Sequence, residues 1–230
     1  MIQPARISTA AGDRTLAVLA APLPLDELVA GTSSGSVDWE VEIGFGKGRY
    51  LLRRCREDAG RRFLGVEVAG EYHGLFVDRA RRHGLTNWLA LRGDALYLAS
   101  AVLPAGFAAA LHVYFPDPWP KLRHHKRRLF DPETVDLVFR LLRRGGRFSF
   151  ATDFLDYGER VAEILAGYPG LRLARREGSW DEGPRTNYEA KYEREGRPIL
   201  RLEGVLEIDG GDAPLHPEGA RAVRVAPNSA

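Results

Sequence analysis

The feature that most constrains the fold is an apolar segment that runs directly into a glycine-rich stretch, VDWEVEIGFGKGRYL, at residues 37–51. A short strand is expected at Val37–Ile43, and helical periodicity follows from Arg49 to Asp58. The glycines between them carry no Cβ atom, so the turn can be tight and the backbone can approach a ligand closely. Strand, glycine loop and helix in this order are typical of the first unit of an α/β sheet.

The alternation of strand and helix patterns continues for most of the chain. Further strands are expected at residues 63–68, 88–92, 109–115 and 147–152, and further helices at 71–83, 95–103, 131–144 and 157–166. In the helix at 131–144, Asp131 is the expected N-cap, Pro132 takes the first helical position, and Gly145–Gly146 ends the helix. Two late strands are expected at 171–176 and 199–208. The pattern predicts an α/β fold with a doubly wound, mostly parallel sheet and helices on both faces.

The two ends of the chain differ in composition from this central domain, which spans residues 37–208. Residues 1–36 are rich in Ala, Pro, Gly and Ser and are expected to form a partly flexible N-terminal extension, with at most one short helix between Arg14 and Ala30. Residues 209–230 are rich in Gly, Pro and Ala and are expected to form a poorly ordered tail. A hydrophobic content of 44% is enough to bury a core and argues against global disorder.

Several classes of protein are excluded by composition. A single cysteine, Cys55, rules out an internal disulfide and a cysteine metal cluster. The start of the chain lacks the apolar core of a signal peptide, and no run approaches the roughly 18 apolar residues that span a bilayer. We therefore expect a cytoplasmic protein without membrane contact.

Three acids lie at or directly after the carboxyl ends of the first three strands of the central domain, namely Glu42, Glu67 and Asp94. The loop glycines Gly44 and Gly46 lie at the same sheet edge, because parallel strands end there together. Glu67 lies about 20 residues beyond the loop, where an acid that holds ribose hydroxyls is expected, and Asp94 can accept a hydrogen bond from an adenine amino group. Three carboxylates suit a cationic, ribose-bearing ligand such as S-adenosylmethionine better than a pyrophosphate. Solvated turn acids are the alternative.

The segment YFPDPWPKLRHHKRRLF, residues 114–130, joins a stiff acidic elbow to a basic arm. Asp117 lies between two prolines, whose fixed φ angles restrict the elbow, and Trp119 follows. An isolated charge run is often only a solvated face, but beside a ligand crevice it favours contact with phosphates. The histidine pair lacks a third ligand at a matching spacing, so no metal site is expected. The arm consists of Lys121, Arg123, His124, His125, Lys126, Arg127 and Arg128.

The motifs EIGFGKG, GVEV, GDA, FPDPWPKLRHHKRR, ATD and TNYE, in this order, resemble those of the bacterial tRNA (guanine-N7-)-methyltransferase family. The resemblance covers roughly Val37 to Leu206, and the block around FPDPWPK is its most specific part. It implies a Rossmann-like class I methyltransferase fold. It also implies transfer of a methyl group from S-adenosylmethionine to N7 of guanine-46 in the variable loop of tRNA. The sequence leaves open whether the protein is a monomer or a homodimer.

The resemblance also implies roles for individual residues. The residues on the cofactor side are Glu42, Gly44, Gly46, Glu67, Asp94 and Asp117, and Asp117 is also the proposed catalytic position. Those that match substrate contacts are Lys121, Asp153, Thr186, Asn187, Tyr188 and Glu189. Those that match the RNA-contacting stretch are Arg123, His124, His125, Lys126, Arg127 and Arg128. Many family members have Lys or Arg where this chain has Asn187, so the resemblance implies a weaker phosphate contact at that position.

Guanine N7 carries an in-plane lone pair and no proton at neutral pH, so the reaction needs alignment rather than a general base. We place Asp117 near the transferred methyl and expect Asp153 to fix the base through its N1 and N2 donors. Trp119 and Tyr188 are candidates for stacking on a splayed-out guanine.

Three other functions fit parts of the sequence. A methyltransferase acting on a small molecule or a protein would not need the basic arm. A nicotinamide-dependent oxidoreductase is disfavoured by the G-x-G-x-G spacing and by the three acids. A nucleic-acid-binding module that has lost catalysis is disfavoured because all four proposed cofactor acids are present, but only turnover separates it from an enzyme.

Overall fold

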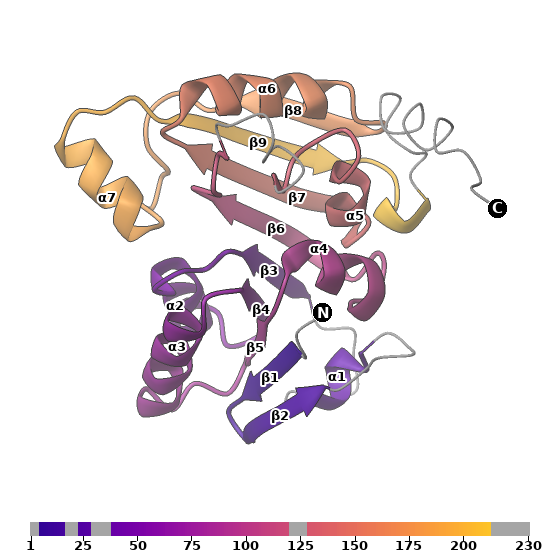
Figure 1. The fold of residues 1–230 in the computed structure, drawn as a ribbon, viewed down its shortest axis with the longest axis vertical. Coiled ribbons are helices and arrows are strands. Elements are labelled where there is room, and N and C mark those ends of the chain that lie inside the picture. Colours follow the sequence, from indigo (N-terminus) through magenta and orange to yellow (C-terminus); the bar gives the residue numbers. More distant parts are fainter. Residues whose placement is uncertain (1–4, 17–22, 29–37, 120–127, 213–230) are drawn as a thin grey trace.

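The computed structural model describes residues 5–16, 23–28, 38–119 and 128–212, which fold around one mixed β-sheet (Figure 1). In these ranges the sheet has nine strands in the order β2-β1-β5-β4-β3-β6-β7-β9-β8. The five strands from β3 to β7 run parallel, whereas β1, β8 and β9 pair antiparallel with their neighbours. The strands are β1 (Ala5–Thr9), β2 (Gly12–Leu16), β3 (Trp39–Ile43), β4 (Arg62–Glu67), β5 (Trp88–Arg92), β6 (Ala108–Tyr114), β7 (Leu142–Thr152), β8 (Leu171–Arg175) and β9 (Leu200–Leu206).

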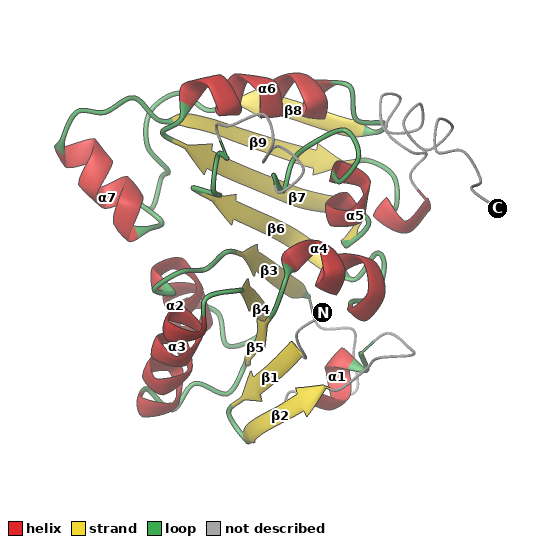
Figure 2. Ribbon diagram, in the orientation of Figure 1, coloured by secondary structure: helices red, strands yellow, loops and turns green. Residues whose placement is uncertain are grey.

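Helices cover both faces of the sheet, which confirms the predicted doubly wound α/β fold (Figure 2). The helices are α1 (Leu25–Leu28), α2 (Arg49–Glu57), α3 (Gly70–Arg82), α4 (Ala95–Tyr97), α5 (Val135–Phe139), α6 (Leu155–Ala166) and α7 (Asn187–Arg194), with a π-helical turn η1 (Leu98–Val102) and a 3₁₀ turn η3 (Gly210–Asp212). In the described ranges no helix is long and apolar enough to cross a lipid bilayer.

The central strands are buried on both faces because their side chains alternate between two hydrophobic cores. On β4, Leu64 and Val66 join the core under η1, α5 and α6, whereas Phe63 joins the core under α2 and α3. On β5, Leu89 joins the core under η1, α5 and α6, and Trp88 joins the core under α2 and α3. The two cores fix the register of the parallel strands and hence the positions of their carboxyl ends.

The helix expected at residues 131–144 is much shorter in the structure. The carbonyl of Asp131 accepts hydrogen bonds from the backbone amides of Thr134 and Val135, so residues 131–134 form a turn and Thr134 is the N-cap of α5. The expected N-cap at Asp131 is therefore wrong. Leu142 already belongs to β7, where it pairs with Ala108 before the register shifts. Burial of Leu142 in the sheet overrides its helical periodicity.

The N-terminal segment contains a β-hairpin that the sequence did not predict. Strand β2 ends at Leu16, where a helix was expected to have begun, and α1 comprises only four residues. The hairpin pairs with β5, and Ile7 is buried opposite Leu91. Residues 5–16 thus extend the sheet at its β5 edge. The expected tail lies mostly outside the described residues, which end at Asp212. The two late strands are confirmed as β8 and β9.

Close packing of α2 on the sheet depends on Gly65 in β4. A Cβ atom there would lie 2.5 Å from Leu51 Cδ2 and 2.5 Å from Phe45 Cδ1. We predict that Gly65→Ala lowers the free energy of unfolding by about 1–3 kcal/mol, because the core cannot accept the methyl group without repacking. In denaturant titrations Gly74→Ala, in α3 with open space around it, should be neutral or stabilising by up to about 1 kcal/mol. Equal effects of the two substitutions would contradict this account of the packing.

Candidate active site

The candidate site lies at the carboxyl ends of the parallel strands, on the left of Figure 1. Strand order reverses between β3 and β6, and α/β folds bind ligands outside the strand ends at such a switch point. The structure brings to this edge the five acids named from the sequence, which leave β3 to β7 in the order Glu42, Glu67, Asp94, Asp117 and Asp153.

The glycine loop between β3 and α2 takes a conformation that suits glycine. Gly44, Gly46 and Gly48 have φ angles of 75°, 51° and 70°, in the left-handed region. A Cβ atom at Gly44 or Gly46 would meet open space, whereas one at Gly48 would lie 2.6 Å from Phe76 Cδ2. Gly48 thus serves the packing of α2 against α3. The other two leave a cradle that a ligand can enter.

Glu67 connects the glycine loop to the start of α3. Its carboxylate accepts two hydrogen bonds of 2.8 Å, one from the backbone amide of Gly46 and one from that of Ala69. The side chain is almost fully buried. A carboxylate has about four acceptor positions, so two backbone donors leave capacity for hydroxyl donors of a ligand.

Glu42 is buried at the end of β3, and its Oε2 atom has no hydrogen-bond partner. Burial raises the pKa of this carboxyl to about 8, and the neighbouring charge of Glu67 adds to the effect. A backbone hydrogen bond at Leu51 and the positive charges of Arg185 and Arg53 act in the opposite direction. A buried acid with an unpaired oxygen is a place where a ligand cation or donor would be stabilised.

Asp94 takes part in local structure as well. Its Oδ1 atom accepts a hydrogen bond of 2.9 Å from the backbone amide of Tyr97, so Asp94 is the N-cap of α4. The residue is exposed at the strand-end edge. The cap fixes the direction of its carboxylate, and the proposed contact with an adenine amino group remains a prediction.

The acidic elbow after β6 has strained backbone angles. Phe115 and Trp119 have φ angles of 51° and 40°, which side chains other than glycine rarely adopt. Such strain is found at sites where the backbone must present a particular group. Asp117 lies between these two residues and is exposed. Arg128 fixes the elbow from behind, because its Nε donates a 2.8 Å hydrogen bond to the carbonyl of Pro118.

The rest of the basic arm falls outside the described residues. This applies to six of its expected contact residues, Lys121, Arg123, His124, His125, Lys126 and Arg127. Arg128 also lies over the ring of Tyr157, with its Cζ atom 5.0 Å from the ring centroid.

The TNYE motif forms the start of α7, and two of its residues hold that helix in place. Thr186 is the N-cap and accepts a 3.0 Å hydrogen bond from the amide of Glu189. Glu189 is fully buried and forms an ion pair of 2.8 Å with Arg201 of β9. It also accepts a 2.7 Å hydrogen bond from the amide of Arg185. Asn187 and Tyr188, by contrast, are exposed.

Arg185 is a site residue that the sequence analysis missed. Its side chain is 12% exposed and donates to Tyr114 Oη at 2.5 Å and to Glu182 Oε1 at 2.7 Å. Its guanidinium group lies 3.8 Å from the ring centroid of Trp180. Its position before Thr186 gave no signal, because the pairing depends on a residue of β6 that is far away in the sequence. Arg185 attaches the start of α7 to the strand ends.

Phe115 of the elbow forms an aromatic cluster with Tyr188 and Tyr192 of α7. Phe115 lies 6.2 Å from Tyr188 and 5.7 Å from Tyr192 between ring centroids, and the two tyrosines are 6.1 Å apart. The charge of Asp153 acts on Tyr192, whose pKa is raised mainly by burial. The sequence analysis named only Tyr188. The four-residue spacing of the tyrosines on a helix was an available signal for the second.

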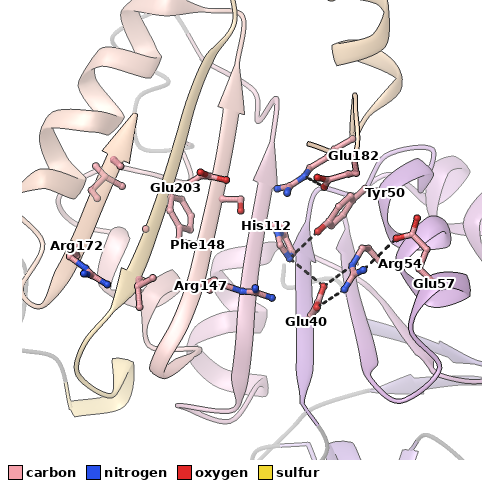
Figure 3. Close-up of a pocket in the computed structure, with 16 residues that line it drawn as sticks. Glu40, Tyr50, Arg54, Glu57, His112, Arg147, Phe148, Arg172, Glu182 and Glu203 are labelled. Atoms are coloured by element: carbon pink, nitrogen blue, oxygen red, sulfur yellow. Dashed lines mark hydrogen bonds and ion pairs between the residues drawn. The ribbon is translucent and has the colours of Figure 1, made fainter. Parts of the chain in front are cut away.

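A cavity of about 790 Å³ adjoins this site, and its lining includes Tyr50 of α2 and Arg185 (Figure 3). At one side Glu40 is buried and pairs with Arg54 at 2.9 Å and with His112 at 3.6 Å. Although burial opposes it, hydrogen bonds from His112 and Arg54 hold the pKa of Glu40 well below its usual range. His112 lies 3.3 Å from Tyr50 Oη and 3.0 Å from Tyr114 Oη. Tyr114 connects this network to the strand-end site, since it also binds Arg185.

Among the described residues no group of three or more His, Cys, Asp or Glu side chains could hold a metal ion. Cys55 is buried in α2, and burial raises the pKa of its thiol.

The sheet with helices on both faces is that of a class I methyltransferase, a Rossmann-like fold. The chain superposes on the crystal structure of the 16S rRNA methyltransferase KamB with a TM-score of 0.60 and 18% identity, over 88% of this chain and 99% of that one. It also superposes on a Haemonchus contortus N-methyltransferase in complex with S-adenosylhomocysteine, with a TM-score of 0.51 and 11% identity, over 77% of this chain and 50% of that one. At these identities the likeness shows the fold alone.

Sequence comparison assigns the chain to a family within this fold class. The model of a family described as "Putative methyltransferase" matches residues 38–202. A tRNA (guanine-N(7)-)-methyltransferase of Nitrosococcus oceani is 38% identical over 169 residues, which are 74% of this chain and 72% of that relative. The chain belongs to the tRNA (guanine-N7-)-methyltransferase family, as its motifs indicated.

The raised pKa of Glu42 predicts a pH-dependent stability. The folded state holds this proton more tightly than the unfolded chain, so the stabilisation is complete below about pH 4.5 and is lost as the pH rises to about 8. In urea titrations near pH 5.5 and near pH 8.5, the wild type should lose on the order of 3–5 kcal/mol more unfolding free energy than Glu42→Gln. Because the amide does not titrate, the difference between the two proteins isolates Glu42. Parallel pH profiles would show that Glu42 is ionised throughout.

Proposed function

We propose that this protein transfers the methyl group of S-adenosylmethionine to N7 of guanine-46 in the variable loop of tRNA. The observation that carries the proposal is the aromatic cluster of Phe115, Tyr188 and Tyr192, which lies beside the strained elbow of Asp117 at the same sheet edge as the glycine loop. The aromatic cluster would hold a flat base, and the glycine loop beside it would hold a cationic cofactor. The activity named for the Nitrosococcus oceani relative supports this assignment.

The residues of the glycine loop and its acids fit S-adenosylmethionine. The open space at Gly44 and Gly46 admits a ligand close to the backbone. The unpaired Oε2 of Glu42 suits an ammonium or sulfonium charge, and Glu67 retains acceptor capacity for ribose hydroxyls. The cofactor supplies an electrophilic methyl group on a sulfonium. These chain residues hold and orient it.

The chemistry on guanine needs alignment more than proton transfer. N7 presents a lone pair without a proton, so no side chain has to act as a general base. Positive charge appears on the purine ring during transfer, and a carboxylate near the ring stabilises it. Asp117 occupies the exposed tip of the elbow and takes this role in our proposal, while Asp153 accepts from the donors on the Watson–Crick edge of the base.

Tyr188 is the residue best placed to stack on the guanine. It is 53% exposed although it contacts two other rings, so one of its faces remains available. Stacking of a base on an aromatic side chain contributes about 1–3 kcal/mol. Trp119, the other candidate, lies in the strained elbow and is half-buried there.

The basic arm completes the proposal. Lys121 and the cations from Arg123 to Arg128 would bind tRNA phosphates and set affinity without reading sequence. We place the enzyme in the cytoplasm, as a monomer or a homodimer, without a metal ion.

The direct test incubates the protein with unmodified tRNA transcript and labelled S-adenosylmethionine, followed by strand cleavage specific for 7-methylguanine. A single cut at position 46 is the expected result. Incorporation of label without that cut would support a methyltransferase and contradict the assignment of N7 as the methylated atom. Absence of label, with tRNA and S-adenosylmethionine both bound, would favour a binding module.

A matched pair of variants tests the base site in the same assay. Tyr188→Ala should raise the KM for tRNA about tenfold, because one stacking contact is lost, whereas Tyr188→Phe should remain near wild type. Cofactor affinity should not change in either variant. A loss of activity in both variants would assign the effect to the hydroxyl group rather than to stacking.

A further inference from the structure

A stripe of arginines runs along one face of α2. Arg49, Arg53 and Arg56 are spaced at i, i+4 and i+7, so they lie on the same side of the helix and extend over about 10 Å of its axis. The stripe begins directly after the glycine loop. None of these side chains belongs to the sequence motifs, and only Arg53 acts on the strand-end site, through its charge near Glu42.

The stripe forms one wall of a groove of about 600 Å³. Arg79 of α3, His83 directly after α3 and Asn187 at the start of α7 line the groove as well. Because Tyr188 follows Asn187 directly, the groove and the proposed base site share the start of α7.

The groove is positively charged and incompletely neutralised. Four guanidinium groups line it against one carboxylate, that of Glu57, and Arg53 also forms an ion pair of 3.3 Å with Glu182, which leaves two positive charges. The carboxylate of Glu57 is shared between two arginines, since it lies 3.7 Å from Arg53 and 3.4 Å from Arg54. In the described part of the chain no carboxylate lies within ion-pair distance of Arg49 or Arg56, and both residues are exposed. Such a concave, cationic surface attracts polyanions.

Two of the arginines are held in position by backbone carbonyls rather than left to move in solvent. Arg79 donates to the carbonyl of Lys47 at 3.2 Å, and Arg53 donates to the carbonyl of Glu182 at 3.3 Å. The second bond ties the stripe to the loop that carries Arg185. A solvated charge run would need neither bond, so the groove is organised before a ligand arrives.

We infer that this groove binds the sugar-phosphate backbone of the tRNA strand that carries the target guanine, on the side of the base site opposite the elbow. The inference rests on the proposed function and extends it to a second contact surface. Phosphate contacts fix the path of the strand and carry no sequence information, so the groove sets affinity and orientation rather than the choice of base.

The test compares two double variants that remove the same charge. In Arg49→Gln/Arg56→Gln the groove loses two cations. In the control, Arg147→Gln/Arg172→Gln, two exposed arginines are removed from β7 and β8, outside the groove. We expect the groove variant to bind tRNA about tenfold more weakly between about 50 and 200 mM salt, with a salt slope reduced by about 1.4, as for two lost single-strand phosphate contacts. Its S-adenosylmethionine affinity and its kcat at saturating tRNA should equal those of the wild type.

A gain-of-function variant complements the loss. Asn187→Lys adds a cation to the lining of the groove and should tighten tRNA binding. The salt slope of tRNA binding should become steeper by about 0.7. Equal weakening by the two double variants, or an unchanged slope in the groove variant, would overturn the proposal. Because binding is measured without turnover, these results stand apart from the cleavage test. A wild type that binds tRNA but methylates another position would refute the proposed function and leave the groove intact.

Discussion

The burial of the Glu42 carboxyl at the end of β3 is the interaction on which the site depends. One of its oxygens has no partner, Glu67 repels its charge, and Arg185 and Arg53 attract it. The neighbouring glycine loop leaves open space on the ligand side. Burial therefore favours the protonated form of this carboxyl below about pH 8. In our proposal a cationic ligand relieves this unfavourable burial.

The second element of the site is held by a buried ion pair far from the glycine loop. Glu189 pairs with Arg201, and Arg185 attaches the same segment to Tyr114. These contacts fix α7 across the strand ends, so that Tyr188 lies next to Phe115. Two residues of the TNYE motif are thus structural and two are exposed, so the motif combines a helix anchor with an exposed surface.

The parts of the fold that the sequence predicted are those with a strong local signal. The buried parallel strands are apolar runs, so the strand ends and the acids after them could be located. The hairpin of β1 and β2 was missed because its two strands, ARIST and GDRTL, are short and polar. Helix 131–144 was too long because burial of Leu142 in β7 depends on contacts with β6. Arg185 and Phe115 could not be assigned to the site from the sequence, because they reach it through tertiary contacts that no local pattern encodes.

Our proposal implies that the cation of the cofactor replaces a proton on Glu42. Calorimetry of S-adenosylmethionine binding near pH 6.5, in buffers of different ionisation enthalpy, measures this exchange directly. The account predicts release of close to one proton per cofactor bound by the wild type, declining above about pH 8, and none by Glu42→Gln. Binding by the wild type without proton release at that pH would contradict it.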